Sequence, residues 1–171
     1  ISYLCYTSRE FIPCTNQEFK LRNHLEEEIK TDISDQVRTC FDELATSMGK
    51  KDEVVEARYD GFEVEIVPRK INVNVHGKIT STKSGKTTTQ ENITASYSSR
   101  LYEIVKVVQE IMSKEATYCD FELSGFMIFY PTFEIDKAMT RDSTTIYTVK
   151  HNKGVEVFNF AIRSCSYPPG I

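Results

Sequence analysis

The sequence has no tryptophan and no cluster of lysine and arginine, and its net charge is −4. Because nucleic-acid binding depends on clustered basic side chains, we expect no nucleic-acid partner. Nor is there an apolar run of the ~18–20 residues that are needed to cross a bilayer. The chain begins at Ile1 rather than Met, which predicts either a removed leader or an ectodomain separated from an upstream membrane anchor.

Sequence motifs of catalysis and cofactor binding are also missing. There is no G-x-S-x-G, no glycine pattern for phosphates or dinucleotides, and no C-x-x-C. His24, His76 and His151 are scattered singly, and we interpret each as a surface residue. His24 and Glu28 share one helical face, which is half of a metal site at most. The sequence therefore predicts no catalytic residue, no cofactor and no metal.

What the chain does have is five cysteines: Cys5, Cys14, Cys40, Cys119 and Cys165. Structural zinc sites usually need two close pairs of ligands, which this spacing does not offer. We favour a disulfide framework, with a zinc site or a set of reduced thiols in a cytosolic protein as alternatives. A disulfide framework implies an oxidising, extracytoplasmic compartment. The candidate N-glycosylation site at Asn92, in Asn92-Ile93-Thr94, is compatible with that compartment.

The cysteine spacing also predicts the pairing. Cys5 and Cys14 enclose eight residues, too wide a gap for a redox motif, and a bond there would stabilise the fold by ~2–3 kcal/mol. Cys165 follows the last predicted strand, and Cys119 leaves the second predicted helix, so we favour Cys119–Cys165. The alternatives are a bond between Cys40 and Cys165, and a Cys165 that is unpaired or paired outside this chain. Cys40 is then the odd thiol, expected to be buried on a helix stripe and unreactive.

In the first half of the chain, Thr15-x-x-Glu18 has the form of a capping box and predicts a helix that begins at Thr15. Apolar residues then recur every three or four positions as far as Gly49, so the helix either curls around its core or breaks near 31–35. Alternating apolar residues at 62–66 and 71–75 predict antiparallel strands. A threonine-rich hairpin follows, with its turn at 84–85.

In the second half, an apolar stripe after Ser98-Ser99 predicts a second helix, and residues 125–136 and 144–164 supply further strands. The predicted fold class is α+β, with two main helices packed on one face of an antiparallel β-sheet of meanders and hairpins. We expect one domain, 1–171, in which 1–15 is a disulfide-clasped segment and 16–97 and 98–171 are each a helix plus a meander. The expected common core is Leu25, Ile29, Ile104, Val108, Ile111, Phe158 and Phe160.

Both ends of the chain carry a resemblance. The stretches "YLCYT", "PCTNQ", "LRNHLEEEI" and "FAIRSCSYPPG" resemble a group of archaeal membrane-anchored proteins, in which a pilin-like or signal-anchor N-terminus precedes an extracytoplasmic region. The resemblance covers 3–44 and 158–171. It implies an outward-facing, tethered domain and brings no catalytic residues.

These observations favour a non-enzymatic, extracytoplasmic module at the cell surface, structural or protein-binding, tethered to a membrane upstream of Ile1. Its partner would be another protein or a second copy of itself. One alternative is an enzyme or ligand-binding domain whose site is assembled from residues distant in sequence. Another is a subunit of a pilus-like filament, which would pair through exposed strand edges.

Overall fold

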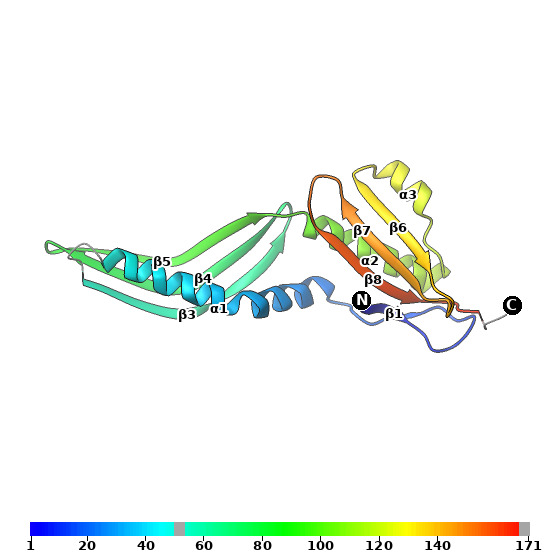
Figure 1. The fold of residues 1–171 in the computed structure, drawn as a ribbon, viewed down its shortest axis with the longest axis horizontal. Coiled ribbons are helices and arrows are strands. Elements are labelled where there is room, and N and C mark those ends of the chain that lie inside the picture. Colours follow the sequence, from blue (N-terminus) through cyan, green and yellow to red (C-terminus); the bar gives the residue numbers. More distant parts are fainter. Residues whose placement is uncertain (50–53, 168–171) are drawn as a thin grey trace. The chain divides into compact units, whose positions relative to one another are not determined.

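The computed structural model describes residues 1–49 and 54–167. This part of the chain holds three helices and two β-sheets, and it divides into two compact units (Figure 1). One unit is made of Ile1–Leu21 and Ser99–Ile171, and the other is Arg22–Ser98. The predicted α+β class is confirmed. The prediction of two main helices on one face of a single sheet is wrong, because each unit has its own sheet.

The unit Arg22–Ser98 is a long helix beside a three-stranded antiparallel sheet of order β3-β4-β5. Its strands are β3 (Val54–Val67), β4 (Lys70–Lys83) and β5 (Lys86–Ser98). The predicted alternation is confirmed at 62–66, since Phe62, Val64 and Ile66 are buried and the glutamates between them are exposed. At 71–75 the strand is confirmed but the alternation is not, because these residues of the central strand β4 are all half-buried. The polar hairpin with its turn at 84–85 is confirmed too, and it continues the strands that precede it.

Helix α1 (Leu21–Gly49) runs along this sheet and is held to it by a few specific contacts (Figure 1). The Phe41 ring lies 5.3 Å from that of Tyr59. A Cβ added to Gly77 would come within 3.2 Å of the Phe41 ring, so the missing side chain lets the helix approach. Near the start of α1, Glu26 Oε1 accepts a hydrogen bond of 2.9 Å from the Ile66 N–H.

The predicted start of this helix and the alternative of a break within it need correction. It begins at Leu21, not Thr15, because Thr15 and Asn16 form the short strand β2 (Thr15–Asn16), which pairs with β1 (Tyr3–Tyr6). Strand pairing across the loop closed by Cys5 and Cys14 thus overrides the local capping pattern. The helix does not break at 31–35 either: the hydroxyls of Thr31 and Ser34 donate to helix carbonyls instead of capping a second helix.

The unit that contains both chain ends is a five-stranded sheet of order β2-β1-β8-β7-β6. Besides β1 and β2, the sheet contains β6 (Phe133–Met139), β7 (Thr145–His151) and β8 (Val157–Arg163). The unit also contains the helices α2 (Leu101–Tyr118) and α3 (Leu123–Phe129). Since β1 runs parallel to β8, the sheet is mixed and not purely antiparallel as predicted. Residues 125–129, predicted as strand, belong to α3.

The core of this unit lies between α2 and the sheet. Ile104, Val108 and Ile111 are fully buried, as are Val149 and Phe160 on the strands. The second predicted helix and its core-facing stripe are therefore confirmed.

The other members of the expected common core lie elsewhere. Phe158 is only half-buried, and Leu25 and Ile29, also half-buried, belong to the unit Arg22–Ser98. The chain has two cores where the sequence predicted one.

Candidate functional site

The four cysteines expected to form disulfides are paired as predicted. Cys5 bonds to Cys14, with Cα atoms 5.4 Å apart, and Cys119 bonds to Cys165, with Cα atoms 5.7 Å apart. The first bond closes the loop between β1 and β2, and the second ties the end of α2 to the segment after β8. Two such bonds indicate an oxidising, extracytoplasmic environment.

Cys40 is the remaining cysteine, and the expectation that it is buried is wrong. It is a free thiol on the exposed side of α1. Its neighbour Phe41 is the residue that packs against the sheet, while Val37 is only half-buried and Leu44 is exposed. The sheet covers only part of the apolar stripe of this long helix. The apolar spacing therefore predicts more burial than α1 has.

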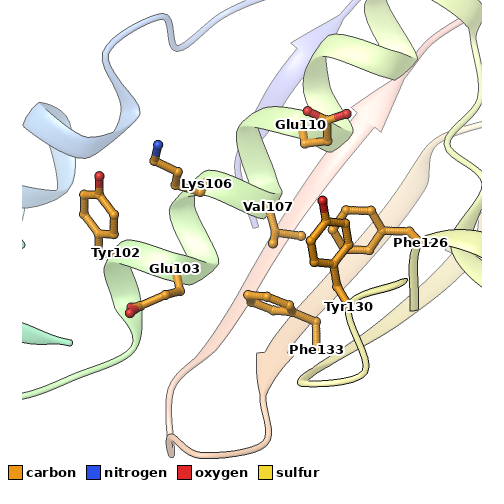
Figure 2. A pocket seen from close by; sticks show the side chains of 8 residues that line it. All are labelled: Tyr102, Glu103, Lys106, Val107, Glu110, Phe126, Tyr130 and Phe133. Atoms are coloured by element: carbon orange, nitrogen blue, oxygen red, sulfur yellow. The ribbon is translucent and has the colours of Figure 1, made fainter. Parts of the chain in front are cut away.

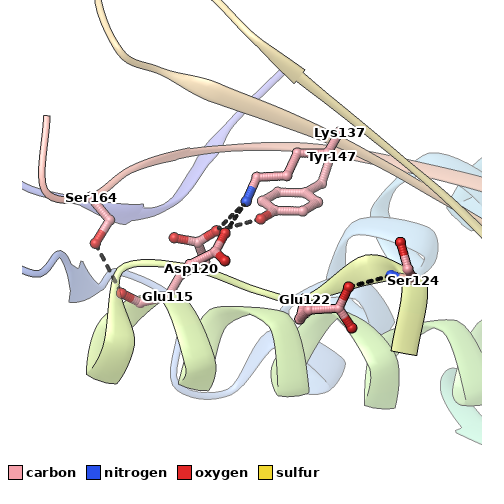
Figure 3. A network of polar contacts seen from close by, with 7 residues as sticks. All are labelled: Glu115, Asp120, Glu122, Ser124, Lys137, Tyr147 and Ser164. Carbon is pink, nitrogen blue, oxygen red and sulfur yellow. Dashed lines mark hydrogen bonds and ion pairs between the residues drawn. The ribbon is translucent and has the colours of Figure 1, made fainter. Parts of the chain in front are cut away.

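A polar network that the sequence did not predict lies at the end of α2 (Figure 3). Glu115 is 3% exposed, and its Oε1 accepts a hydrogen bond from the Tyr147 hydroxyl. Lys137 Nζ lies 3.5 Å from the same oxygen and 2.5 Å from Asp120 Oδ1. Burial, and the hydrogen bond to Glu115, raise the pKa of Tyr147 well above its ordinary value.

The backbone of Glu115 joins this network to the disulfides. Its carbonyl accepts hydrogen bonds from the Ser164 hydroxyl at 2.9 Å and the Cys119 N–H at 3.1 Å. Ser164 Oγ in turn accepts from the Cys14 N–H at 3.0 Å. Glu115, Tyr147 and Lys137 resemble a catalytic set by residue type, but their polar groups are engaged with one another, which is the arrangement of a structural brace.

The remaining single residues singled out in the sequence do not converge. His24 lies 3.3 Å from Glu28 on the surface of α1, and His76 lies 3.7 Å from Glu63 on the sheet. The prediction that His151 is a surface residue is wrong. It is 7% exposed, and its ring packs edge-on against the Phe133 ring with the ring centres 5.0 Å apart. Asn92 is exposed on β5 with a φ of 51°, and its glycosylation stays a prediction.

The most distinctive surface feature is a groove of about 440 Å³ between α2 and the segment formed by α3 and the start of β6 (Figure 2). Val107, 6% exposed, contributes to it from α2. Phe126, Tyr130 and Phe133 line the opposite side, with the Phe126 and Tyr130 ring centres 4.7 Å apart. Tyr102, Glu103, Lys106 and Glu110 complete the lining from α2.

Helix α3 itself is the second distinctive feature. Its sequence is LSGFMIF, yet none of its residues is buried. Ile128 is 77% exposed and Phe129 is 81% exposed, immediately beside the groove residues Phe126 and Tyr130. A helix of this composition gains little from folding alone, because the burial of each large apolar side chain would be worth about 1.5–3 kcal/mol.

Local contacts position α3 despite its exposure. The Glu122 side chain caps the helix by accepting hydrogen bonds from the N–H groups of Ser124 and Gly125. A Cβ at Gly125 would meet Glu122 Oε2, so a side chain there would shift the capping carboxylate. Pro131 follows the helix and the Tyr130 N–H returns to the Phe126 carbonyl at 2.8 Å. The apolar surface is therefore presented by a defined structure.

Neither a metal site nor a membrane-spanning helix is found in the described residues. Within 1–49 and 54–167, no group of three or more His, Cys, Asp and Glu side chains is arranged to hold a metal ion. Over the same residues, no helix combines the length and the apolarity that crossing a membrane takes.

Compared with known proteins, the chain matches no protein family, no curated protein and no solved structure. The resemblance to archaeal membrane-anchored proteins therefore stays a prediction.

Sequence reasoning missed both α3 and Glu115, although each left a signal. Residues 126–130 are five consecutive apolar residues between an acid at 122 and Pro131, a run without the alternation of a half-buried strand. Glu115 follows Ile111 by four residues on the apolar stripe of α2. A carboxylate in that position indicates a buried polar partner, here Tyr147.

Proposed function

We propose that this chain is a non-enzymatic, extracytoplasmic protein-interaction module, tethered to a membrane upstream of Ile1, that binds its partner through α3 and the adjoining groove. The observation that carries the proposal is an apolar helix that buries none of its residues and leaves Ile128 and Phe129 more than three-quarters exposed. Contiguous exposed apolar surface beside a groove is typical of protein-binding sites. The two disulfides support the compartment.

A protein partner is favoured over a lipid surface by the charges around α3. Glu110 lines the groove, Glu122 caps the helix, and Glu134 is exposed on the next strand. Interfacial helices that bind membranes carry lysine and arginine on the flanks of their apolar face, because the headgroups of such surfaces are often anionic. Glu110 and Glu134 are paired with Lys114 at 3.8 Å and Lys150 at 3.5 Å, so the flanks of α3 carry no excess of basic side chains, unlike those of such helices.

The proposal is tested by the native size of the protein in extracts of the cells that make it, solubilised in mild detergent. We expect the wild type to migrate in a complex larger than the monomer. Phe129→Ser should shift it to the monomer position, whereas the control Val155→Ser, at an 86% exposed valine outside the groove, should leave the complex intact. A complex that survives Phe129→Ser, or a wild type that is monomeric, would refute binding through α3.

A second candidate, a filament subunit, is favoured by β5. This strand has 13 residues, lies at the edge of its sheet, and is exposed at every position except Ile93. Edges of that length pair readily with other strands. A glycan at Asn92 on the same strand would obstruct such pairing, so occupancy of Asn92, measured by mass spectrometry, separates the two proposals.

A further inference from the structure

We infer that the groove beside α3 binds a segment of a partner protein in which an apolar or aromatic side chain stands next to a lysine or arginine. The inference rests on the proposed interaction function and adds the chemistry of the partner. It is drawn from the shape of the groove, the charges along it, and one carboxylate oxygen that lacks a hydrogen-bond donor.

The apolar part of the groove fits a few side chains. Its volume of about 440 Å³ lies at the small end of the range for ligand pockets. Val107 lies on one side and the rings of Phe126 and Phe133, 6.5 Å apart, on the other (Figure 2). Ile128 and Phe129 extend this apolar surface beyond the groove. An anchor residue inserted here would be surrounded by aromatic rings.

The charged part consists of two carboxylates, one on each side of Val107 along α2. Glu110 Oε1 lies 3.8 Å from Lys114 Nζ, an exposed pair of the kind that contributes little, so this carboxylate can accept a further cation. Glu103 precedes Val107 by four residues and Glu110 follows it by three, so their Cα atoms are roughly 10 Å apart along the helix. Lys106 is the one basic residue in the lining, and its Nζ lies 5.6 Å from the Tyr102 ring centre. Figure 2 shows its ammonium group turned away from Phe126, Tyr130 and Phe133.

Glu103 is incompletely satisfied in the isolated chain. Its Oε1 lies 3.6 Å from Arg100 Nη1, while Oε2 is buried and accepts no hydrogen bond from the described residues. Buried acceptors normally have a donor, and a charged donor gives the stronger bond. The Glu103 side chain is 25% exposed, so a rotation of its carboxylate would bring Oε2 to an ammonium or guanidinium group of a partner. The faces of the neighbouring rings would attract the same cation.

These charges disfavour a second copy of this chain as the occupant. The net charge of the chain is −4, and the groove lining contributes two acids against one lysine. Two copies would bring acidic rims together, whereas a basic segment would complement them.

The test uses a displayed library of random twelve-residue peptides, selected on the intact protein with its disulfides formed. Phe129→Ser serves for counter-selection, so that only peptides that need the α3 surface are kept. We expect the enriched peptides to share an aromatic or aliphatic residue beside lysine or arginine.

The second step measures the affinity of a synthetic copy of the best peptide. Glu103→Gln with Glu110→Gln should weaken its binding by about three- to tenfold, as expected for losing two partly exposed charge contacts. The control Glu56→Gln with Glu65→Gln removes two exposed acids of β3, outside the lining, and should leave its affinity unchanged.

Each other outcome has a definite meaning. Enriched peptides that are neutral or acidic, or an affinity unaffected by the Glu103 and Glu110 substitutions, would overturn the inference and leave an interaction site at α3 intact. No enrichment over Phe129→Ser would overturn the site itself, and the proposed function with it. Dimerisation of the wild type in analytical ultracentrifugation, lost in Phe129→Ser, would make the second copy the occupant and would also overturn the inference.

Discussion

At the scale of single residues, the chain separates side chains that brace the fold from side chains that the fold leaves exposed. Glu115 and Tyr147 are buried and bonded to each other, whereas Cys40 and Phe129 face solvent. Composition alone suggests the reverse, since a carboxylate is expected outside and a cysteine or phenylalanine inside. The difference lies in which element each residue stands on and what covers that element.

The first residue-scale prediction concerns the pH dependence that Tyr147 confers. Because its pKa is raised in the folded protein, Tyr147 keeps its proton at a pH where the unfolded chain loses it. Its contribution to stability is therefore complete below about pH 10, the ordinary pKa of tyrosine, and is lost as the pH rises above that value. Chemical denaturation between pH 8 and pH 11 should show a steeper loss of unfolding free energy for the wild type than for Tyr147→Phe. Parallel curves would contradict the buried hydrogen bond to Glu115.

The second residue-scale prediction concerns the reactivity of the Cys40 thiol. Since this thiol is exposed, a polar maleimide should add once to the native protein, and peptide mapping should place the adduct at Cys40. Cys40→Ser should abolish the adduct and change the unfolding free energy by less than about 0.5 kcal/mol. Labelling that occurs only in denaturant would mean that the helix face is covered after all.

At the scale of elements, α2 and α3 differ in how much of their apolar surface is buried. Both are rich in apolar residues, but α2 buries its stripe against the sheet and α3 buries none of its residues. The Ser99 hydroxyl accepts from the Leu101 N–H at 3.1 Å, and Glu156 accepts from the Arg100 N–H at 3.1 Å, so the start of α2 is fixed within its own unit. We infer that α2 provides stability and α3 provides the binding surface.

One matched pair of substitutions tests this division for α2. Val108 is fully buried, and Val108→Ala should lower the unfolding free energy by about 1–3 kcal/mol. Val155 is 86% exposed in the same unit, and Val155→Ala should change it by less than about 0.5 kcal/mol. Equal effects at the two valines, measured by urea denaturation, would mean that the stripe of α2 does not form the core.

At the scale of the whole molecule, what the sequence predicts well is local and what it misses depends on distant contacts. The strands of 62–66 and 71–75, the hairpin turn at 84–85 and the second helix follow from alternation, turn residues and helical spacing. The pairing of β1 with β8 does not, because it joins the first residues of the chain to the last strand. The displaced helix start has a different cause, because Thr15 and Asn16 pair with β1 and the helix then begins at Leu21.

The division into two units and the exposure of α3 were missed for the same reason. Apolar periodicity shows that a face is to be covered but not by which partner, so Leu25 and Ile104 were assigned to one core although they lie in different units. For α3, no segment of the described residues buries Ile128 or Phe129, and its apolar run predicts a strand because it does not show whether the run will be covered. Among the candidate site residues, the cysteine pairing was accessible because spacing and order along the chain constrain it.

The central claim, that α3 is a binding surface for another protein, is tested most directly by a photoreactive amino acid at position 128. Ile128 is 77% exposed, so a reactive group there would report whatever covers the helix in the cells that make the protein. We predict a discrete protein adduct from position 128 that is absent when the same group is placed at the exposed position 155. Adducts with lipid alone, equal adducts from both positions, or no adduct at 128 would contradict the claim.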